Sequence, residues 1–506
     1  MGGNYAKGVY DQLMDVMVRL DTMEAAHMQD RKEIRMLTSE VGSLRRENTR
    51  LREEISGLRQ ENAALKEEGA TLRKENSLLR EDNERMRRIL DNDSTNSSLP
   101  PSSDQPGKAP NTYNGRKPTK KRPGAQPGHK GNGLSKAEVR QKIQDGVYGH
   151  RVEEIGATDR PYITRYRLDL DVRTIATEIR IHADEGGKFQ VPDELRADVS
   201  YGGTVRAIAA FLYSEGVVAN DRICTFINSL SGDSLHISTG SVYGLCKKFS
   251  EACSRVGTAI EQGLLNAPVI CTDATPVRTD GRLTYIRNFS TERYALYCSC
   301  EKKDLASLGE LRILKSFTGT FIHDHETALY HFGTRHGECN VHLERYLLKN
   351  TEETGNTWSH KMACFLEGLN RARKVKKKRG ETCFSSEQIE RYTVRYDGII
   401  AIGQRENRHT RGKIAKREEK ALLTRLVKYK ANHLLFLNDF RIHYSNNMSE
   451  KDLRICKGRQ KMSGGFRTAS GREMYCKIMS FIETVKRRGL NIFQSIIGLM
   501  DGTPVI

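Results

Sequence analysis

The stretch PVICTDATPVRTDGRLTYIRNFSTERYALYCSC, residues 268–300, decides the fold class of this 506-residue chain. Its first run is apolar and ends in the acid Asp273, and alternating segments follow it. Alternation of this kind predicts strands. The Asp280-Gly281 pair that joins residues 276–278 to 283–289 is a strong signal for a tight hairpin turn. We therefore expect three consecutive strands here.

Two further features complete the expected α/β core. Residues 304–315 have a helical pattern, and a fourth strand then ends in another acid, Asp324. Much further along the chain, Glu450, Arg454 and Lys457 are spaced so that they share one face of a helix. Each acid alone has an ordinary alternative, because an Asp after an apolar run often lies in a turn or cap, and Glu450 could be a helix-surface acid.

The N-terminal region has a seven-residue leucine repeat. Leucine recurs at every seventh position from Leu37 to Leu79, and Met86 takes the next place. This period predicts a coiled coil over residues 10–93. Acidic g positions face basic e positions of a parallel, in-register partner, so we expect a homodimer. The alternatives are one solvated helix or a helix packed on the protein's own body, for which the apolar stripe is narrow.

A basic, proline-rich linker is expected over residues 94–146. Seven of the chain's 12 prolines lie between Pro100 and Pro127, so a helix cannot continue there. The segment is also rich in cations, including Lys120, Lys121 and Arg122. These three side chains could neutralise DNA phosphates, and the alternative is a soluble linker without a binding role.

Two smaller regions precede the core. Residues 147–198 are expected to form a small β region, with two strands over 165–182. Residues 199–265 have helical patterns, and Ser238 is a candidate N-cap of one helix. A DNA-binding helix-turn-helix and a plain helical domain both fit this pattern.

Composition narrows the class of protein. The chain has 83 Lys and Arg against 64 Asp and Glu, a formal net charge of +19, which makes a polyanion the first partner to test. The longest apolar stretch, residues 207–213, is too short to span a bilayer. The 11 cysteines include no Cys-x-x-Cys pair, so we expect a reduced, intracellular chain without disulfides. A cationic run over 371–379 is either a second DNA contact or a solvated face.

Four motifs carry a family resemblance. They are NSSLPPSSD at 96–104, GAQPGHKG at 124–131, CNVHLER at 339–345 and NNMSE at 446–450. Together they resemble the bacterial insertion-sequence transposases of the insertion sequence 66 (IS66) family. The order of strands and acids likewise resembles the ribonuclease H-like fold of DDE recombinases. The resemblance implies a catalytic core over 266–500 with a helical insertion at about 346–432.

The resemblance also implies the catalytic residues and their metal. Asp273, Asp324 and Glu450 would be the DDE triad and would hold two Mg²⁺ ions, for which Mn²⁺ can substitute. No zinc is expected, because the family's zinc module corresponds to residues 148–188, which contain no cysteine. A Cys and a His alone, as in Cys339 and His342, cannot complete a four-ligand zinc site.

The implied activity is strand cleavage at the element's ends, followed by attack of the freed 3′-hydroxyl on target DNA. The residues expected to contact double-stranded DNA, besides the linker cations, are Arg345, Arg454, Lys457, Arg459 and Lys461. Small accessory transposition proteins are possible partners, a membrane is not, and a cytoplasmic, nucleoid-associated location is expected. Two other classes stay open: a catalytically inactive dimeric DNA-binding regulator derived from a transposase, and an RNA-binding coiled-coil scaffold, for which no aromatic ribonucleoprotein motif is found.

Roles can also be predicted for three residues and one helix outside the triad. We expect Cys339 to pack in the core, and His342 to lie near the active site or to be a structural histidine. Trp358 is expected in the core, with base stacking as the alternative. A C-terminal helix over 473–487 is expected to pack on the sheet.

Overall fold

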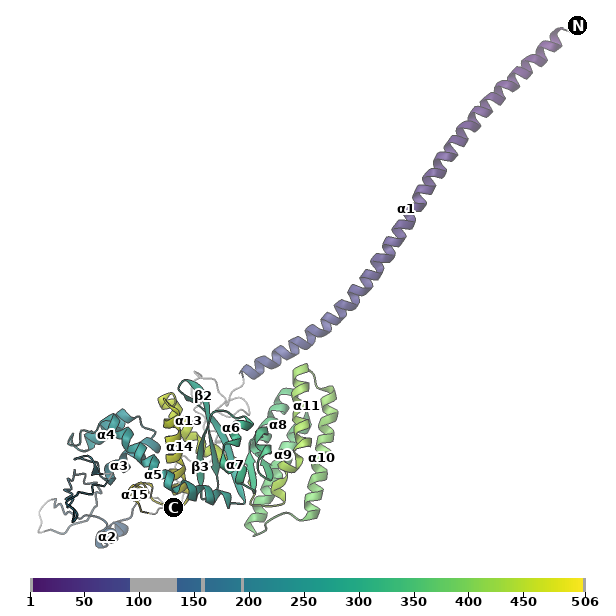
Figure 1. Ribbon diagram of the computed structural model, residues 1–506. Helices are drawn as coiled ribbons and strands as arrows, with labels where there is room; N and C mark the ends of the chain where they lie inside the picture. The colour runs from purple at the N-terminus through teal and green to yellow at the C-terminus, as the bar shows by residue number, and fades with distance from the viewer. Residues whose placement is uncertain (1–2, 92–133, 156–159, 193–194, 504–506) are drawn as a thin grey trace. The chain divides into compact units, whose positions relative to one another are not determined.

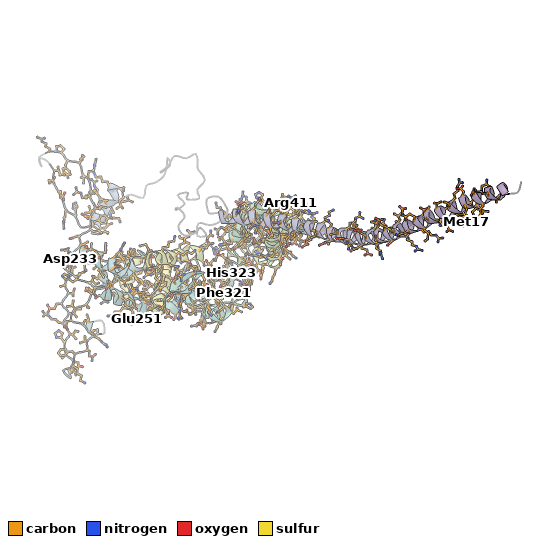
Figure 2. The ribbon with its side chains drawn as sticks, turned by 90° about the horizontal axis from the view of Figure 1, so that it is seen from above. Met17, Asp233, Glu251, Phe321, His323 and Arg411 are labelled. Atoms are coloured by element: carbon orange, nitrogen blue, oxygen red, sulfur yellow. The ribbon has the colours of Figure 1, made fainter. Side chains whose placement is uncertain are left out.

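A long N-terminal helix precedes the folded body of the chain. The computed structural model describes residues 3–91, 134–155, 160–192 and 195–503 (Figure 1). The chain divides into two units, and the first contains helix α1 (Gly3–Asp91), which is 89 residues long. Its heptad leucines are exposed, from 44% at Leu51 to 58% at Leu65, and the side chains of α1 stand out from the helix (Figure 2). The predicted helix is confirmed, and its pairing with a second copy stays a prediction.

A five-stranded mixed sheet forms the centre of the second unit. Its order is β3-β2-β1-β4-β5, and the strands are β1 (Val269–Thr279), β2 (Arg282–Ser290), β3 (Ala295–Cys300), β4 (Thr320–His323) and β5 (Arg335–Glu338). The first three strands are antiparallel, whereas β4 and β5 run parallel to β1. Asp280 and Gly281 turn the β1–β2 hairpin with φ of 51° and 71°, as a two-residue type I′ turn requires. The four predicted strands are confirmed.

The position of Asp273 differs from the expectation. We expected it at the end of a strand, but it lies inside β1. The reason is that β1 has two partners of different length. Its parallel pairing with β4 ends at Cys271, opposite Ile322, whereas its antiparallel pairing with β2 continues to Thr279.

Strand β5 has no signal in the sequence. Its four residues, RHGE, lack apolar alternation, yet three of them are buried. The buried carboxylate of Glu338 accepts hydrogen bonds from Arg425 and His433, two residues of the helical insertion. A strand whose buried polar groups find their partners only in the tertiary structure cannot be found from hydrophobic periodicity.

Helices cover both faces of the sheet. One face packs on α5 (Thr239–Leu265), α6 (Leu305–Gly309) and α7 (Arg312–Ser316), the last two replacing the single helix expected there. The other face packs on α8 (Asn340–Thr354), α13 (Asn447–Ser463) and α14 (Ala469–Arg487). The predicted packing of the C-terminal helix on the sheet is confirmed: the N–H groups of Ala295 and Tyr297 in β3 donate to the hydroxyls of Thr484 and Ser480 in α14.

The insertion between β5 and α13 is helical, as expected. Beyond α8 it consists of α9 (Thr357–Lys378), α10 (Ser386–His409), α11 (Lys413–Lys428) and α12 (Lys430–His433) (Figure 1). Apolar side chains of α9, α10 and α11 share one core with α8 and the sheet. Trp358 is fully buried in this core, and its indole N–H donates to Glu419 at 2.6 Å. Trp358 is therefore a packing residue and not a base-stacking wedge.

Shorter helices lie outside the sheet. They are α2 (Lys136–Gln144), α3 (Gly203–Ser214), α4 (Asn220–Leu230), α15 (Ile492–Met500) and two 3₁₀ turns, η3 (Thr327–His331) and η4 (Leu435–Leu437). Ser238 caps α5 as expected, because its side chain accepts the N–H of Ser241 at 3.1 Å. The region 199–265 thus contains α3, α4 and α5, and its role in DNA binding stays a prediction.

The two strands expected over residues 165–182 are not formed in the described part of the chain. The pairing nearest to them is an isolated bridge between Ala183 and Phe189. Leu170 and Ile175 are 87% and 81% exposed. Alternating residues stabilise a strand only when one face can be buried, and within the described ranges no second layer covers this segment.

Candidate active site

Strand register brings Asp273 and Asp324 to the same level of two neighbouring strands. The last parallel pair of β1 and β4 is Cys271 with Ile322; Asp273 lies two residues further along β1, and Asp324 is two residues beyond Ile322, directly after β4 ends. Because side chains alternate along a strand, the acids leave the sheet on the same face as Cys271 and Ile322. This is the face that α8 and α13 cover.

The start of α13 is fixed beside the first acid. Asn446 is fully buried, and its side-chain amide donates to the Thr272 carbonyl at 2.9 Å. Its backbone N–H donates to the sulfur of Cys339 at 3.2 Å. Glu450 then lies in the first turn of the helix, one turn beyond Asn446. The first Asn of the NNMSE motif therefore anchors the element that carries the third acid.

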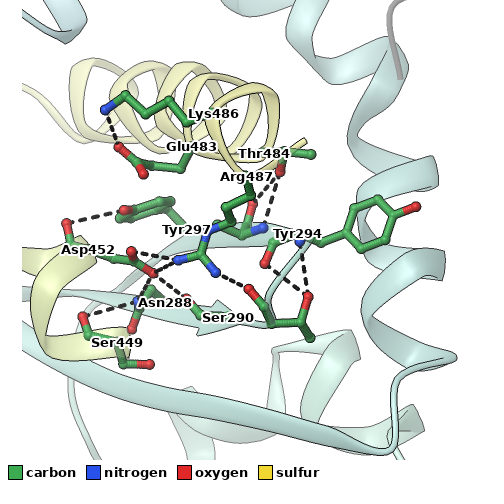
Figure 3. Close-up of polar contacts among 12 residues, drawn as sticks. Asn288, Ser290, Tyr294, Tyr297, Ser449, Asp452, Glu483, Thr484, Lys486 and Arg487 are labelled. Carbon is green, nitrogen blue, oxygen red and sulfur yellow. Dashed lines mark hydrogen bonds and ion pairs between the residues drawn. The ribbon is translucent and has the colours of Figure 1, made fainter. Parts of the chain in front are cut away.

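A buried polar network holds the same helix against β2 and α14 (Figure 3). Asn288 accepts the Asp273 N–H at 3.3 Å and donates to the Ser449 carbonyl and to Asp452. Arg487 of α14 donates to both carboxylate oxygens of Asp452, at 2.5 and 2.6 Å. One amide side chain thus links the backbone of Asp273 to the residue that precedes Glu450.

Four side chains of different chemistry converge at this position. One ligand atom each from Asp324, Cys339, His342 and Glu450 lies within 4.8 Å of the other three. His342 Nδ1 is 3.3 Å from Asp324 Oδ2 and 3.6 Å from Glu450 Oε1. Among the described residues, Asp324 Oδ1 and Glu450 Oε1 are buried and accept no hydrogen bond. This arrangement is suited to a cation.

The structure tests the roles predicted for Cys339 and His342. Cys339 is 1% exposed, so its predicted burial is confirmed, but its sulfur also lies among possible metal ligands. His342 lies near the acids, which was one of its two readings. The sequence motif shows only the Cys and the His of this cluster. The other two possible ligands, Asp324 and Glu450, are brought beside them by the tertiary fold.

The electrostatics of the site are those of a cluster of neighbouring acids. Burial, and then the charge of Asp324, raise the pKa of Asp273 to about 6. Burial would lower the pKa of His342, but Asp324 and Glu450 together hold it above its ordinary value. Burial and the charge of Asp324 also raise the pKa of the Cys339 thiol. Shifts of this kind, in groups that face one another, are typical of functional sites.

Most of the expected DNA-contacting cations of α13 face solvent. Arg454, Lys457 and Lys461 are exposed and follow Glu450 at helical spacing. Arg459 is different: its guanidinium donates to the Tyr213 carbonyl at 3.0 Å and lies 4.0 Å from the centre of the Tyr213 ring. Arg459 therefore packs on Tyr213, and its expected DNA contact stays a prediction.

Other cations lie at or near the acids. Arg345 Nη1 is 3.3 Å from His342 Nε2. Lys303, which the sequence analysis did not single out, donates to the Ala274 carbonyl at 3.2 Å, and its charge opposes the rise in the pKa of Asp273. In the run 371–379, Arg373 is buried and donates to two carbonyls, so it belongs to the core. Lys120, Lys121 and Arg122 lie outside the described residues.

The comparisons with known proteins identify the family. A model described as "Transposase IS66 family" matches residues 203–474, more than half of the chain, and includes all three acids. The chain belongs to the IS66 transposase family. A second model, described as a family of unknown function (DUF6444), matches residues 40–135, and no curated protein matches the chain.

Membership of the IS66 family agrees with the resemblance found in the linker and core motifs. It suggests a transposition enzyme that uses a divalent metal and binds DNA. In the described part of this IS66-family chain, no helix combines the length and apolarity needed to cross a membrane.

Proposed function

We propose that this IS66-family chain is a DDE transposase whose triad is Asp273, Asp324 and Glu450. The observation that carries the proposal is the presence of Asp324 and Glu450 in one cluster of possible metal ligands, together with the effect of the Asp324 charge, which raises the pKa of Asp273. Acids this far apart in sequence have no structural need to meet. A partly buried anionic cluster costs stability unless a cation neutralises it, which is the arrangement expected of a metal-dependent enzyme.

The sheet supports a ribonuclease H-like core within the proposed limits of 266–500. Its order is 3-2-1-4-5, with three antiparallel strands followed by two parallel ones. The resemblance to DDE recombinases predicts acids on the first and fourth strands and on a later helix. Asp273 on β1, Asp324 directly after β4 and Glu450 on α13 agree with that pattern.

The residues present fit Mg²⁺. Asp273, Asp324 and Glu450 offer carboxylate oxygens, the ligands that Mg²⁺ prefers, and one buried oxygen of each of the last two accepts no hydrogen bond within the described residues. When bound, a pair of such ions lowers the pKa of water and stabilises the attacking and leaving oxygens of a phosphodiester. Mn²⁺ would serve as a substitute.

The chain's own side chains would bind and align the DNA. Arg454, Lys457 and Lys461 would contact backbone phosphates along α13, and Lys303 and Arg345 would contact those nearest the acids. The proposed reactions are cleavage of one strand at each element end and in-line attack of the 3′-hydroxyl on target DNA. No side chain need form a covalent bond to DNA in either reaction.

The organisation around the core completes the proposal. Helix α1 would form a parallel coiled-coil homodimer, so that two catalytic cores act on two element ends. The linker of residues 94–146 and the helices α3 to α5 would add contacts to DNA. Small accessory transposition proteins would assist the chain in transposition.

The test is metal-dependent cleavage by the full-length chain on DNA carrying the inverted repeats that flank its gene. We expect Asp273→Asn, Asp324→Asn and Glu450→Gln each to reduce cleavage by at least about 1,000-fold, because the three act as one unit. Asp280→Asn, in the exposed β1–β2 turn, is the matched control and should cleave normally.

The main alternative is a dimeric DNA-binding regulator without catalysis. It predicts that the chain binds end DNA equally well with and without EDTA and never nicks it with Mg²⁺ or Mn²⁺. Unchanged cleavage in any of the three acid variants would exclude the proposed triad.

A further inference from the structure

We propose that Asp324, Cys339, His342 and Glu450 form a four-ligand site for a zinc-class transition metal, which competes with Mg²⁺ for the two carboxylates. The site consists of one thiol, one imidazole and two carboxylates, whose ligand atoms lie within 4.8 Å of one another. Only the competition rests on the proposed function. The binding site itself does not.

Two of the separations between ligand atoms match those of tetrahedral coordination. Nitrogen and oxygen ligands about 2.1 Å from a tetrahedral zinc lie about 3.4 Å apart, and sulfur lies slightly further from either. The structure has 3.3 Å between His342 Nδ1 and Asp324 Oδ2, and 3.6 Å between His342 Nδ1 and Glu450 Oε1. A metal ion could therefore occupy the centre of this cluster after small side-chain adjustments.

Three of the four proposed ligand residues carry a buried atom without a hydrogen-bond partner. Within the described residues these are Asp324 Oδ1, Glu450 Oε1 and His342 Nδ1, each of which lacks a hydrogen bond of good geometry. Leaving such atoms buried and unpaired costs free energy, and a metal ion would recover it.

The ligand types select the class of metal. Mg²⁺ takes oxygen ligands and would leave Cys339 and His342 unused, whereas zinc and related ions take sulfur, nitrogen and carboxylate oxygen together. The backbone N–H of Asn446 donates to the Cys339 sulfur at 3.2 Å. A hydrogen bond of this kind would orient and stabilise a metal-bound thiolate.

The contact between Arg345 and His342 should oppose metal binding. Its Nη1 lies 3.3 Å from His342 Nε2, which must carry a proton when Nδ1 binds a metal. Two donors cannot face each other, so Arg345 must turn away for the metal to bind. Arg345→Ala should therefore bind the metal more tightly than the unmodified chain, whereas removing a ligand should weaken binding.

The experiment uses Co²⁺ as a spectroscopic probe of the full-length, metal-free chain. Tetrahedral Co²⁺ gives intense visible bands, and a thiolate ligand adds a charge-transfer band in the near ultraviolet. We expect both in the unmodified chain, displaced by Zn²⁺ and not by Mg²⁺ at equal concentration. Cys339→Ser should remove the charge-transfer band and weaken Co²⁺ binding by more than about 100-fold. Losing a residue that only supports a ligand costs at most about 100-fold in metal affinity, so a larger loss indicates a direct ligand.

The control is Cys364→Ser. Cys364 is an exposed thiol on α9 whose sulfur lies 3.5 Å from His360 Nε2, so these two residues are a surface cysteine–histidine pair that could also bind Co²⁺. The band should persist in this variant. His342→Gln provides a second ligand variant, and circular dichroism checks that each variant is folded. A band absent from the unmodified chain, or lost in Cys364→Ser but kept in Cys339→Ser, would overturn the proposal.

The outcome separates this site from the proposed function. A cobalt site without Mg²⁺-dependent cleavage would leave the transition-metal site standing and reject the nuclease. Mg²⁺-dependent cleavage that Zn²⁺ does not inhibit, together with no cobalt band, would support the nuclease and reject the transition-metal site. If both hold, Zn²⁺ should inhibit cleavage by the unmodified chain, and Cys339→Ser should need at least about tenfold more Zn²⁺ for the same inhibition.

Discussion

The side chain of Asn446 donates a hydrogen bond to the Thr272 carbonyl, at 2.9 Å, and this contact joins the first residue before α13 to the residue before Asp273. It crosses 174 positions of the sequence. The contact is therefore a tertiary link between two of the three acids, Asp273 and Glu450.

Asn446→Ala should impair both stability and cleavage. The change removes a buried donor and leaves the Thr272 carbonyl without it, which should cost about 1–3 kcal/mol in the free energy of unfolding. Chemical denaturation and end-DNA cleavage measure the two effects. Asn447→Ala is the matched control, because Asn447 is the exposed neighbour. Equal effects of the two changes would contradict the anchoring role.

The stability of the metal-free chain should depend on pH through Asp273. Burial and the neighbouring Asp324 raise the pKa of Asp273 to about 6, from an ordinary value of about 3.9 in an unfolded chain. Between these values the folded chain holds a proton that the unfolded chain has lost. The stabilisation is therefore complete below about pH 4 and is lost as the pH rises through 6.

Asp273→Asn should accordingly stabilise the protein in EDTA at pH 8, by up to about 3 kcal/mol, and should change little at pH 4. Urea unfolding at both pH values measures this difference. A gain that is the same at pH 4 and pH 8 would show that charge is not its cause. Asp280→Asn serves as the exposed control.

The heptad leucines of α1 should hold two chains together. Leu58 and Leu65 are 56% and 58% exposed in a single chain, and a parallel partner would bury both. We expect the double change Leu58→Glu and Leu65→Glu to convert a dimer into a monomer in sedimentation equilibrium. Gln60→Glu, on the outer side of the heptad, should leave the dimer intact. A dimer that survives the leucine changes would exclude this interface.

Two cations of α13 should behave differently from their neighbour Arg459. Lys457→Gln and Lys461→Gln should each weaken DNA binding and reduce the salt dependence of the affinity by about one unit of slope. Arg459→Gln should leave the slope unchanged and lower stability by about 1–3 kcal/mol, because it loses a carbonyl and an aromatic contact. Fluorescence anisotropy across a salt series and thermal unfolding distinguish the two effects.

Local patterns predicted the parts of the core that depend on local physics. Alternation and the Asp280-Gly281 turn predicted the β1–β2 hairpin, since turn chemistry and a pleated face are encoded in adjacent residues. The same alternation was misleading over 165–182, where the part of the chain that the structure describes offers no layer to bury one face. Strand β5 was not predicted, because the hydrogen-bond partner of its buried Glu338 is Arg425, which lies far along the sequence.

The candidate site was predictable only in part. The motif around Glu450 identified an acid on a helix, and two apolar runs identified Asp273 and Asp324. Their common face depends on the register of β1 and β4, which no local pattern contains. The meeting of Cys339 and His342 with two of the acids depends on how α8 and α13 pack, so it could not be derived from spacing.

The placement of Glu450 beyond the helical insertion also has a consequence during protein synthesis. A nascent chain that has emerged only as far as α12 already carries the long helix α1 and two of the three acids, but it cannot complete the catalytic cluster. Under the proposed dimer, a prematurely terminated product of this length would still pair with a full-length subunit. Such a fragment would act as a dominant inhibitor, so that translational errors would restrain the element's own mobility.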